Sequence, residues 1–553
     1  MTNLLILFVS YFIVSISLIG YGNLFIKFFA KNYKTTDFGY LGIFGLVFSI
    51  FISYLSNFFI PHNYTFNSIY IILGIFGFIL LFKEFKRPAL KKDLYLFFSI
   101  FILAFISLLI FKNHDDFSYY HFVYTYNLTQ FDLLVGTGQF NHGFRTPSSI
   151  FYINSLFYLP LINYFSFNFA AVFVLGFSNI ILLKKIELIN SKKFKINNKS
   201  IIHNNSVVFF SLLSLIFINI FFYRLGEHGT DRSAMILIIV LVLNLLYFIN
   251  INENKVDNNF LKIISIIFVI IASLKAFYLI YIIILIPLIF YVYKKNKSIE
   301  VFFNKNLLLC ALLLGFVLLT NLFNTGCLLF PEKKTCFFDL PWSLSEKTVE
   351  HLSLHYENWA KAGSGPGYSL AQSEKLNYIS NFNWLNNWID KYFFNKVSDL
   401  IYSLVFISVI FILLFKGSKS IKTSNRNYKS LSFILLLIFS IWFLFHPSLR
   451  YGGYHLFFFI FFIPLSIFLE KFSKDIPNFY RKIIVVVLIT VLIFLGRNIG
   501  RLIKENKIYS YQPFKNVNYS LNDDSFRYQL EMQNIIKENK AKEIYKNRYI
   551  FLN

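Results

Sequence analysis

Long apolar runs separated by short polar segments cover most of the chain. A helix needs about 20 mainly apolar residues to cross the hydrocarbon core of a bilayer. Inside that core every backbone polar group must be paired within the protein, so such runs are expected to be helical. The pattern predicts about fourteen membrane-spanning helices, near 4–29, 39–60, 67–82, 93–111, 165–183, 206–222, 233–250, 261–274, 276–293, 306–323, 397–415, 430–446, 454–469 and 483–496.

Composition supports this interpretation. The chain is 56% hydrophobic and only 15% charged, whereas soluble domains carry about a quarter charged residues. We therefore expect an all-α integral membrane protein, a polytopic helical bundle. The net charge of +25 does not indicate nucleic acid, because the Lys and Arg residues lie in the short segments between apolar runs. Membrane lipid is the expected partner of these charges.

The basic residues alternate between connections, which predicts an orientation. Connections near 83–92, 184–195, 416–426 and 471–482 are rich in Lys and Arg, and the intervening short ones are not. The positive-inside rule places the basic set in the cytoplasm. The N-terminus is then outside, and the first helix lacks the basic leader of a signal peptide, so we expect it to be retained. The expected location is a bacterial-type inner (plasma) membrane, crossed many times.

The apolar stretch 261–293 is too long for one span. Two short helices turning at Lys275 keep the later basic loops cytoplasmic. An ionisable group at that depth is costly and is a functional candidate. The alternative is a lysine that snorkels to the interface.

These spans divide the chain into segments. The polar segments 112–164 and 324–396 and the tail after Arg497 are expected outside the cytoplasm. The predicted order is N-terminal spans 1–111, an acidic loop with amphipathic helices 112–164, central spans 165–323, a large loop 324–396, C-terminal spans 397–496 and a polar tail 497–553.

The first outer loop opens with a cluster of polar residues. Asp115 and Asp116 are adjacent and are flanked by His114 and His121. Repulsion and partial burial can raise the pKa of one carboxyl group, leaving a general base or a metal ligand. Oxygen and imidazole ligands suit Mg²⁺ or Mn²⁺. The alternative is a solvated helix cap at Asp115 or Asp116.

Two later outer turns carry further candidates. Asp231 could cap the seventh span, or it could be the second acid, and a second metal ligand, of a site shared with Asp116. Arg450 lies in a short outer turn between His446 and Tyr451, and all three are candidate substrate contacts, as are His114 and His121. A guanidinium suits bidentate phosphate binding. With Lys275 and Arg232 it could form a cationic patch for a lipid phosphate, or it could make ordinary headgroup contacts.

The large loop 324–396 holds four of the five Trp residues and two of the three Cys residues. Exposed aromatic rings can stack on sugars or can sit at the membrane interface. Cys327 and Cys336 could form a disulfide outside the cytoplasm, where one would persist. The sequence leaves both choices open.

Residues 115–160 follow a recognisable order. An acidic pair is followed by Tyr–His, then by two glycines, and then by a proline-bearing segment that enters a helix. In this chain these are Asp115–Asp116, Tyr120–His121, Gly136 and Gly138, Arg145–Thr146–Pro147, and the run from Phe151 to Pro160.

With the many spans, this order resembles the GT-C superfamily of multi-spanning glycosyltransferases, over roughly the first 185 residues. The chain also looks like a group of bacterial membrane proteins of surface-polysaccharide loci, whose outer loop matches Thr325–Gly326 to Pro331. The resemblance implies a polyprenyl-phosphate-linked sugar donor. Asp115 or Asp116 would then be the base or metal ligand, Asp231 the second acid, and Lys275 or Arg450 the donor-phosphate contact; Arg145 lies within the resembling stretch and is a further substrate contact.

The resulting hypothesis is an inverting glycosyl transfer to a cell-surface glycan or lipid at the outer face of the membrane. One alternative is an O-antigen-type polysaccharide polymerase or ligase, which would depend on Arg and His. Another is a transporter or flippase of lipid-linked saccharides, and a third is a non-catalytic assembly subunit. A conduit needs charges along its path within the spans, and here the polar residues gather at one face.

Overall fold

The computed structural model describes residues 2–29, 35, 37–84, 87–111, 114, 116–187, 205–250, 258–296, 305–365, 372–420, 428–473 and 476–516. Helices dominate, and the β-pairing within these residues consists of two isolated bridges. The α-helices are α1 (Thr2–Phe29), α2 (Phe38–Asn57), α3 (Tyr64–Glu84), α4 (Arg87–Phe105), α5 (Phe122–Gln130), α6 (Ser149–Ser155), α7 (Phe169–Glu187), α8 (Asn205–Phe221), α9 (Leu225–His228), α10 (Thr230–Asn250), α11 (Asn258–Leu274), α12 (Leu285–Asn296), α13 (Lys305–Thr325), α14 (Glu346–Lys361), α15 (Gln372–Ile379), α16 (Leu385–Trp388), α17 (Ser398–Phe415), α18 (Tyr428–Phe445), α19 (Gly453–Lys471), α20 (Phe479–Tyr509) and α21 (Pro513–Asn516).

The expected class, an all-α polytopic membrane protein, is confirmed. Within the described residues, eleven helical stretches are long and apolar enough to cross a membrane, and two shorter apolar helices correspond to α8 and α11. Each of the fourteen predicted runs lies wholly or mainly on helical backbone. The run at 93–111 is the weakest, because α4 begins with a polar turn that contains Lys91, Lys92 and Asp93. Fourteen crossings remain a prediction.

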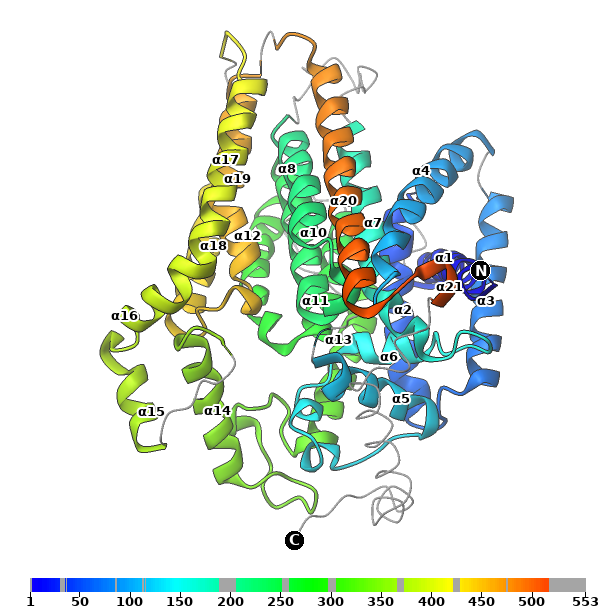
Figure 1. The fold of residues 1–553 in the computed structure, drawn as a ribbon, viewed down its shortest axis with the longest axis vertical. Coiled ribbons are helices and arrows are strands. Elements are labelled where there is room, and N and C mark those ends of the chain that lie inside the picture. The colour runs from blue at the N-terminus through cyan, green and yellow to red at the C-terminus, as the bar shows by residue number, and fades with distance from the viewer. Residues whose placement is uncertain are drawn as a thin grey trace.

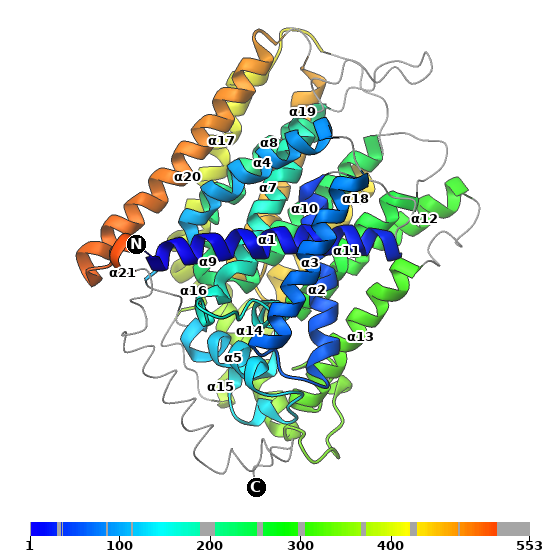
Figure 2. The ribbon, with the colours of Figure 1, turned by 90° about the vertical axis from the view of Figure 1, so that its right-hand side faces the viewer.

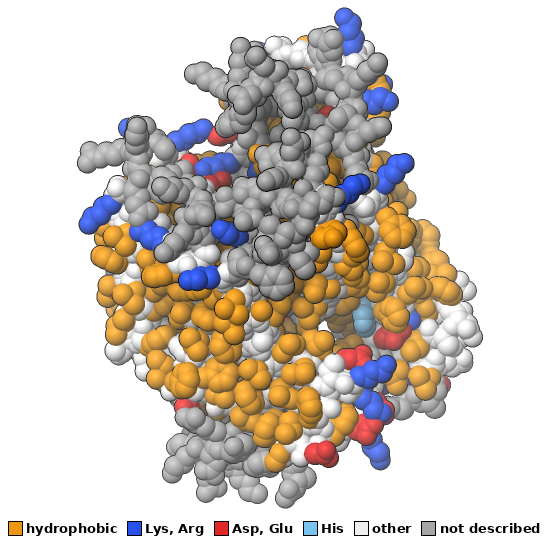
Figure 3. All heavy atoms as spheres, turned by 180° about the vertical axis from the view of Figure 1, so that it is seen from behind, with side chains coloured by type: hydrophobic (Ala, Val, Ile, Leu, Met, Phe, Trp, Pro, Cys, Tyr) orange, Lys and Arg blue, Asp and Glu red, His pale blue; other side chains and the backbone are white. Residues whose placement is uncertain are grey.

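Two ends of the bundle differ in character. The long helices α8, α10, α17, α18, α19 and α20 stand side by side in the upper part of the molecule, and α5, α6, α14 and α15 gather at the opposite end (Figure 1). A broad hydrophobic surface covers the middle (Figure 3). Such a surface is expected where lipid replaces water.

Close helix packing holds the N-terminal part together. In Figure 2 α1 lies across α2 and α3 at a steep angle. Small residues allow the backbones to meet: a Cβ on Gly20 would lie 1.8 Å from the carbonyl oxygen of Gly74, and one on Gly45 would lie 1.9 Å from that of Leu18. Membrane helices commonly pack through such small residues, because lipid provides no hydrophobic drive for their association.

The helix break at Lys275 is confirmed. α11 ends at Leu274, Lys275 is extended (φ −156°, ψ 122°), and a 3₁₀-helix, Ala276–Ile284, leads into α12. The break is held by Ser148, whose hydroxyl donates to the Leu274 carbonyl oxygen at 2.6 Å. The Lys275 side chain therefore projects from an extended residue between two helices rather than from a helix surface.

The segment after α13 has a small hydrophobic core of its own. Cys327 and Cys336 form a disulfide, which resolves the choice that the sequence left open. Phe330, Leu344 and Val349 pack around Cys327. Gly326 has a φ of +83°, and a Cβ there would lie 2.0 Å from the Ser343 hydroxyl, so this turn requires glycine.

Some expected boundaries shift. Helical structure leading into α17 begins at Leu385 rather than at 397, and α20 continues through Arg497 to Tyr509, where a polar tail was expected. Trp384 and Trp388 are buried, at 1% and 4% exposure, so the idea that these two rings are exposed for sugar stacking is wrong. Residues 517–553 of the expected tail lie outside the described residues.

Candidate functional site

Four charged side chains from distant parts of the chain meet at the end of the bundle that carries α5 and α14. Arg450 Nη2 donates to Asp116 Oδ2, and its Nε donates to Asp231 Oδ2 at 2.9 Å. Lys275 Nζ lies 2.9 Å from Asp231 Oδ1. Acids and cations therefore alternate in the order Asp116, Arg450, Asp231, Lys275, which we call the charge chain.

Asp116 stands where the chain changes its helical form. It precedes a π-helical turn, Phe117–His121, that continues into α5; π-turns occur frequently at functional sites. The backbone N–H of Asp116 donates to His114 Nδ1 at 3.1 Å. The same nitrogen lies 3.5 Å from Asp116 Oδ2. His114 thus packs directly beside the carboxylate.

Buried aromatic side chains fix the turn that carries Arg450. Trp388 Nε1 donates to the Pro447 carbonyl oxygen at 2.8 Å, and Trp442 Nε1 donates to that of Ser448 at 2.9 Å. The Leu449 N–H donates to the Tyr392 hydroxyl at 2.7 Å. These hydrogen bonds hold the backbone next to Arg450 in place and so limit the movement of its guanidinium.

A cavity of about 600 Å³ opens beside the charge chain. Figure 3 shows a hollow with a histidine at its mouth, to the right of the broad hydrophobic surface. Asp116, Lys275 and Arg450 line the cavity, whereas Asp231 lies behind the two cations that bind it. Leu279, Val317, Leu329 and Phe330 add an apolar wall.

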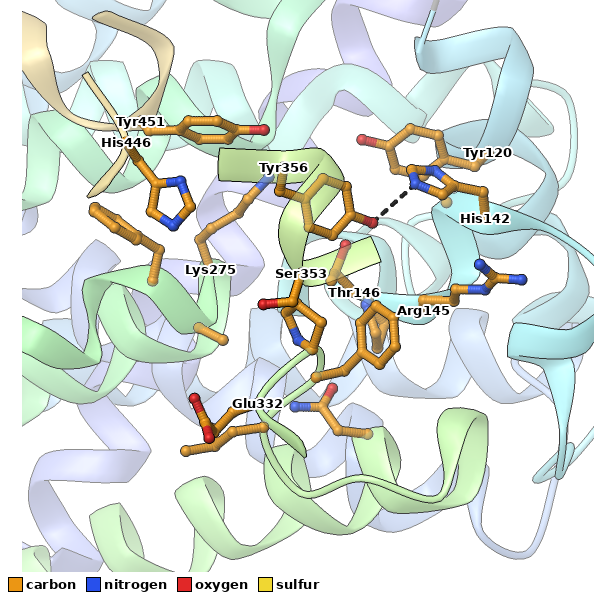
Figure 4. A pocket seen from close by; sticks show the side chains of 18 of the residues that line it. Tyr120, His142, Arg145, Thr146, Lys275, Glu332, Ser353, Tyr356, His446 and Tyr451 are labelled. Carbon is orange, nitrogen blue, oxygen red and sulfur yellow. Dashed lines mark hydrogen bonds between the residues drawn. The ribbon is translucent and has the colours of Figure 1, made fainter. Parts of the chain in front are cut away.

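Arg145 is a further cation in the wall (Figure 4). Its Nε donates to the Gly138 carbonyl oxygen at 2.8 Å. In the part of the chain that the structure describes, no carboxylate pairs with it. Arg145 therefore lines the cavity without an acidic partner among the described residues, unlike Lys275 and Arg450.

One face of α14 forms the opposite wall. Ser353, Tyr356 and Trp359 line the cavity at a spacing of three residues, which is the spacing of one helix face. The Tyr356 hydroxyl lies 2.9 Å from His142 Nε2, so α14 is tied to the loop that holds Arg145 (Figure 4). The role of Tyr356 and His142 was not predicted, although this spacing could have indicated the face.

The environment changes the acidity of the lining groups. Burial would raise the pKa of Asp116, but the Arg450 guanidinium, with smaller contributions from His121 and His114, lowers it overall. The expected rise is therefore wrong for Asp116, because a cation faces the carboxylate. Burial lowers the pKa of His142 and of His446 to about 4, aided by Arg145 and Lys361 respectively.

The predicted residues do not all converge. Asp116, Arg145, Lys275, His446, Arg450 and Tyr451 line the cavity. Arg232 is not among the residues that line it, and its guanidinium lies over the Phe222 ring, 5.8 Å from the ring centroid. His121 is buried behind Asp116 and lines a different, much smaller cavity. Asp115 lies outside the described residues.

A metal does not fit these residues. Among the described side chains, no three His, Cys, Asp or Glu residues lie close enough together to hold an ion. The Arg450 guanidinium occupies the position between Asp116 and Asp231 that Mg²⁺ or Mn²⁺ would need. The suggested metal ligands are thus neutralised by an arginine.

Of three comparisons with known proteins, one gives a match. Neither the curated proteins nor the solved structures contain a match to this chain. A family described as a domain of unknown function (DUF8201) matches residues 4–458, which is most of the chain and includes all four members of the charge chain. The chain belongs to this family.

Proposed function

We propose that the protein is a GT-C-like membrane glycosyltransferase that takes a sugar from a polyprenyl-phosphate donor at the outer face of a bacterial plasma membrane. One observation carries the proposal: Asp116 and three cations, Arg145, Lys275 and Arg450, share one cavity at the end of an apolar helix bundle. The disulfide in the neighbouring loop supports the placement outside the cytoplasm, because disulfides persist in oxidising compartments.

The donor phosphate binds to the cations. Arginine recognises phosphate through paired N–H groups, and Arg145 has no described carboxylate that competes for its guanidinium. Fixed positive charge also stabilises the phosphate as it departs. The sugar lies against Tyr356, Trp359 and Tyr451, whose rings line the same cavity.

In the transfer step, the acceptor hydroxyl oxygen attacks the anomeric carbon on the face opposite the phosphate. The new C–O bond forms as the bond to the phosphate oxygen breaks, and polyprenyl phosphate leaves with the electron pair. Asp116 takes the hydroxyl proton. It becomes basic enough when the donor phosphate displaces it from Arg450, because a partly buried carboxylate without a counter-ion binds a proton more tightly.

Replacement of Asp116 by Asn in the native host tests this proposal. The variant is expected to lose a cell-surface glycan and to accumulate a polyprenyl-linked saccharide, measured by mass spectrometry of lipid extracts. Asp390→Asn, which alters an exposed carboxylate outside the cavity, is the matched control. A normal glycan in an Asp116→Asn strain with wild-type protein levels would exclude the transfer mechanism.

A polysaccharide polymerase or ligase is the second candidate. It is favoured by His142 and His446, two imidazoles that line the cavity and that each have a proton-accepting nitrogen when neutral. In that mechanism a histidine accepts the proton. His142→Gln or His446→Gln would then abolish glycan synthesis, while Asp116→Asn would spare it.

A further inference from the structure

A cluster of buried charges joins α9 to the C-terminal part of α20, and that part of α20 lies beyond the segment that matches the family. Arg501 and Glu505 are 8% and 5% exposed, and Glu227 of α9 is 3% exposed. Arg501 Nη1 lies 3.4 Å from Glu505 Oε1 and 3.9 Å from Glu227 Oε1. Charges buried this deeply are retained only when they are paired and hydrogen-bonded.

The first partner of this cluster is the segment that leads to Asp116. Arg501 Nη2 donates to the Ile106 carbonyl oxygen at 3.2 Å, and the Phe111 N–H donates to Glu505 Oε2 at 3.1 Å. The Phe111 ring stacks on Tyr509, with centroids 4.5 Å apart. Both ends of residues 106–111 are therefore attached to α20, directly before the acidic turn.

The second partner is the segment that leads to Asp231. Glu227 accepts from Arg224 Nε at 2.7 Å and pairs with Arg501, and α9 is followed at once by α10, whose first turn contains Asp231. Arg497 of α20 donates to the Ile220 carbonyl oxygen at 2.6 Å just upstream. One helix end thus contacts the approach to both acids.

We infer that the end of α20 positions the two acidic turns relative to each other, and that Arg501 and Glu505 are positioning residues for the site. The reaction assigned to the site rests on the proposed function, whereas the positioning of the two acidic turns does not. Neither residue lines the cavity. Their effect passes through the backbone of residues 106–111 and of α9.

Carbodiimide labelling of the full-length protein in detergent tests the inference without any transfer assay. The rates of modification of Asp116 and Asp231 are measured by peptide mass spectrometry, with the exposed Glu346 and Glu350 as internal references. Arg501→Met and Glu505→Ala are expected to raise both rates severalfold, because the turns open more often. Glu505→Gln, which keeps an oxygen for the Phe111 N–H, is expected to have a smaller effect, and Arg501→Lys to restore part of the protection.

Lys482→Met is the matched control. Lys482 lies at the other end of α20 and donates to the Leu414 carbonyl oxygen at 2.7 Å, so its loss weakens the same helix far from the acids. Equal labelling in Lys482→Met and Arg501→Met at equal loss of melting temperature would overturn the inference. If Arg501→Met does not fold, the comparison of Glu505→Ala with Lys482→Met decides the question in the same way. If Asp116 and Asp231 are protected from labelling in the wild-type protein but that protein has no transfer activity, the result would contradict the proposed function alone.

Discussion

The Asp116 and Asp231 carboxylates depend on one guanidinium. Asp231 is 6% exposed and forms ion pairs with Arg450 and Lys275. Asp116 forms an ion pair with Arg450 and lies beside His114. Arg145, at the other side of the cavity, has no described acidic partner. The two arginines line the same cavity and differ in what their loss leaves behind.

Replacing Arg450 by Ala is expected to lower the free energy of unfolding by about 2–3 kcal/mol, because two partly buried carboxylates lose their shared donor. Arg145→Ala is expected to change stability by about 0.5 kcal/mol or less. Unfolding in detergent, followed by tryptophan fluorescence, measures both. Equal losses of unfolding free energy in the two variants would contradict the conclusion that Arg450 pairs with carboxylates and Arg145 does not.

His121 gives a pH dependence. It is 7% exposed, its Nε2 has no hydrogen-bond partner among the described residues, and burial lowers its pKa to about 3. Between its unfolded pKa near 6.5 and that value, the unfolded state binds the proton and the folded state does not. Stability is therefore full above about pH 6.5 and falls as the pH is lowered, by up to about 1.4 kcal/mol per pH unit.

The measurement is a series of melting temperatures between pH 7 and pH 4 for the wild-type protein and for His121→Phe. The variant should lose less stability on acidification, because it has no imidazole to protonate. An unchanged pH profile in His121→Phe would place the titrating groups elsewhere.

At the scale of elements, the glycines of α1, α2 and α3 are the clearest constraint. A Cβ on Gly20 would lie 1.8 Å from a backbone oxygen, whereas nothing lies within 4 Å of a Cβ on Gly315 of α13. Gly20→Ala is expected to destabilise by at least about 1–3 kcal/mol through overpacking. Gly315→Ala should be neutral or stabilising, by up to about 1 kcal/mol, because alanine favours a helix. Melting temperatures of the two variants decide this.

The disulfide closes a short loop that contributes Leu329, Phe330 and Pro331 to the cavity. Cys327→Ser combined with Cys336→Ser is expected to destabilise the segment after α13 by about 2–3 kcal/mol, because the open loop gains conformational entropy. Limited proteolysis of this segment, with and without reductant, measures the effect. Reductant should have no further effect on the double variant.

Sequence patterns predicted the positions of the helices better than the contacts between side chains from distant helices and loops. Apolar runs located the helices, and the parity of basic loops located the break at Lys275. The burial of Trp384 and Trp388 was missed, because an aromatic residue in a polar loop has the same pattern whether it faces a sugar or the core. The position of Asp231 beside Arg450 arises from packing between residues 219 positions apart, and no local pattern encodes such a distance.

The direction of a side chain was also hidden. Asp231 and Arg232 are neighbours in sequence, yet one enters the charge chain and the other lies over Phe222. Helical geometry turns successive side chains by about 100°, so only the orientation of α10 decides which of the two faces the site. Arg501 and Glu505 were missed for a related reason, since a polar end of an apolar helix resembles a solvated tail.

At the scale of the whole molecule, the two ends of the bundle should face different compartments. Tyr119, 40% exposed, lies at the cavity, and Lys416 follows α17 at the basic end. In spheroplasts, a membrane-impermeant maleimide is expected to label Tyr119→Cys but not Lys416→Cys. Native background is low, because Cys310 is buried and the other two cysteines are joined. Labelling of residue 416 alone would invert the orientation.

The participation of α20 has a consequence for biosynthesis. Asp231 and Lys275 can pair soon after they leave the ribosome, but Asp116 must wait until residue 450 has been made. Residues 501–511, which fasten the segments leading to both acids, are synthesised later still. A nascent chain that already contains all four members of the charge chain therefore holds an unfinished site, and the site is completed only when α20 has been inserted.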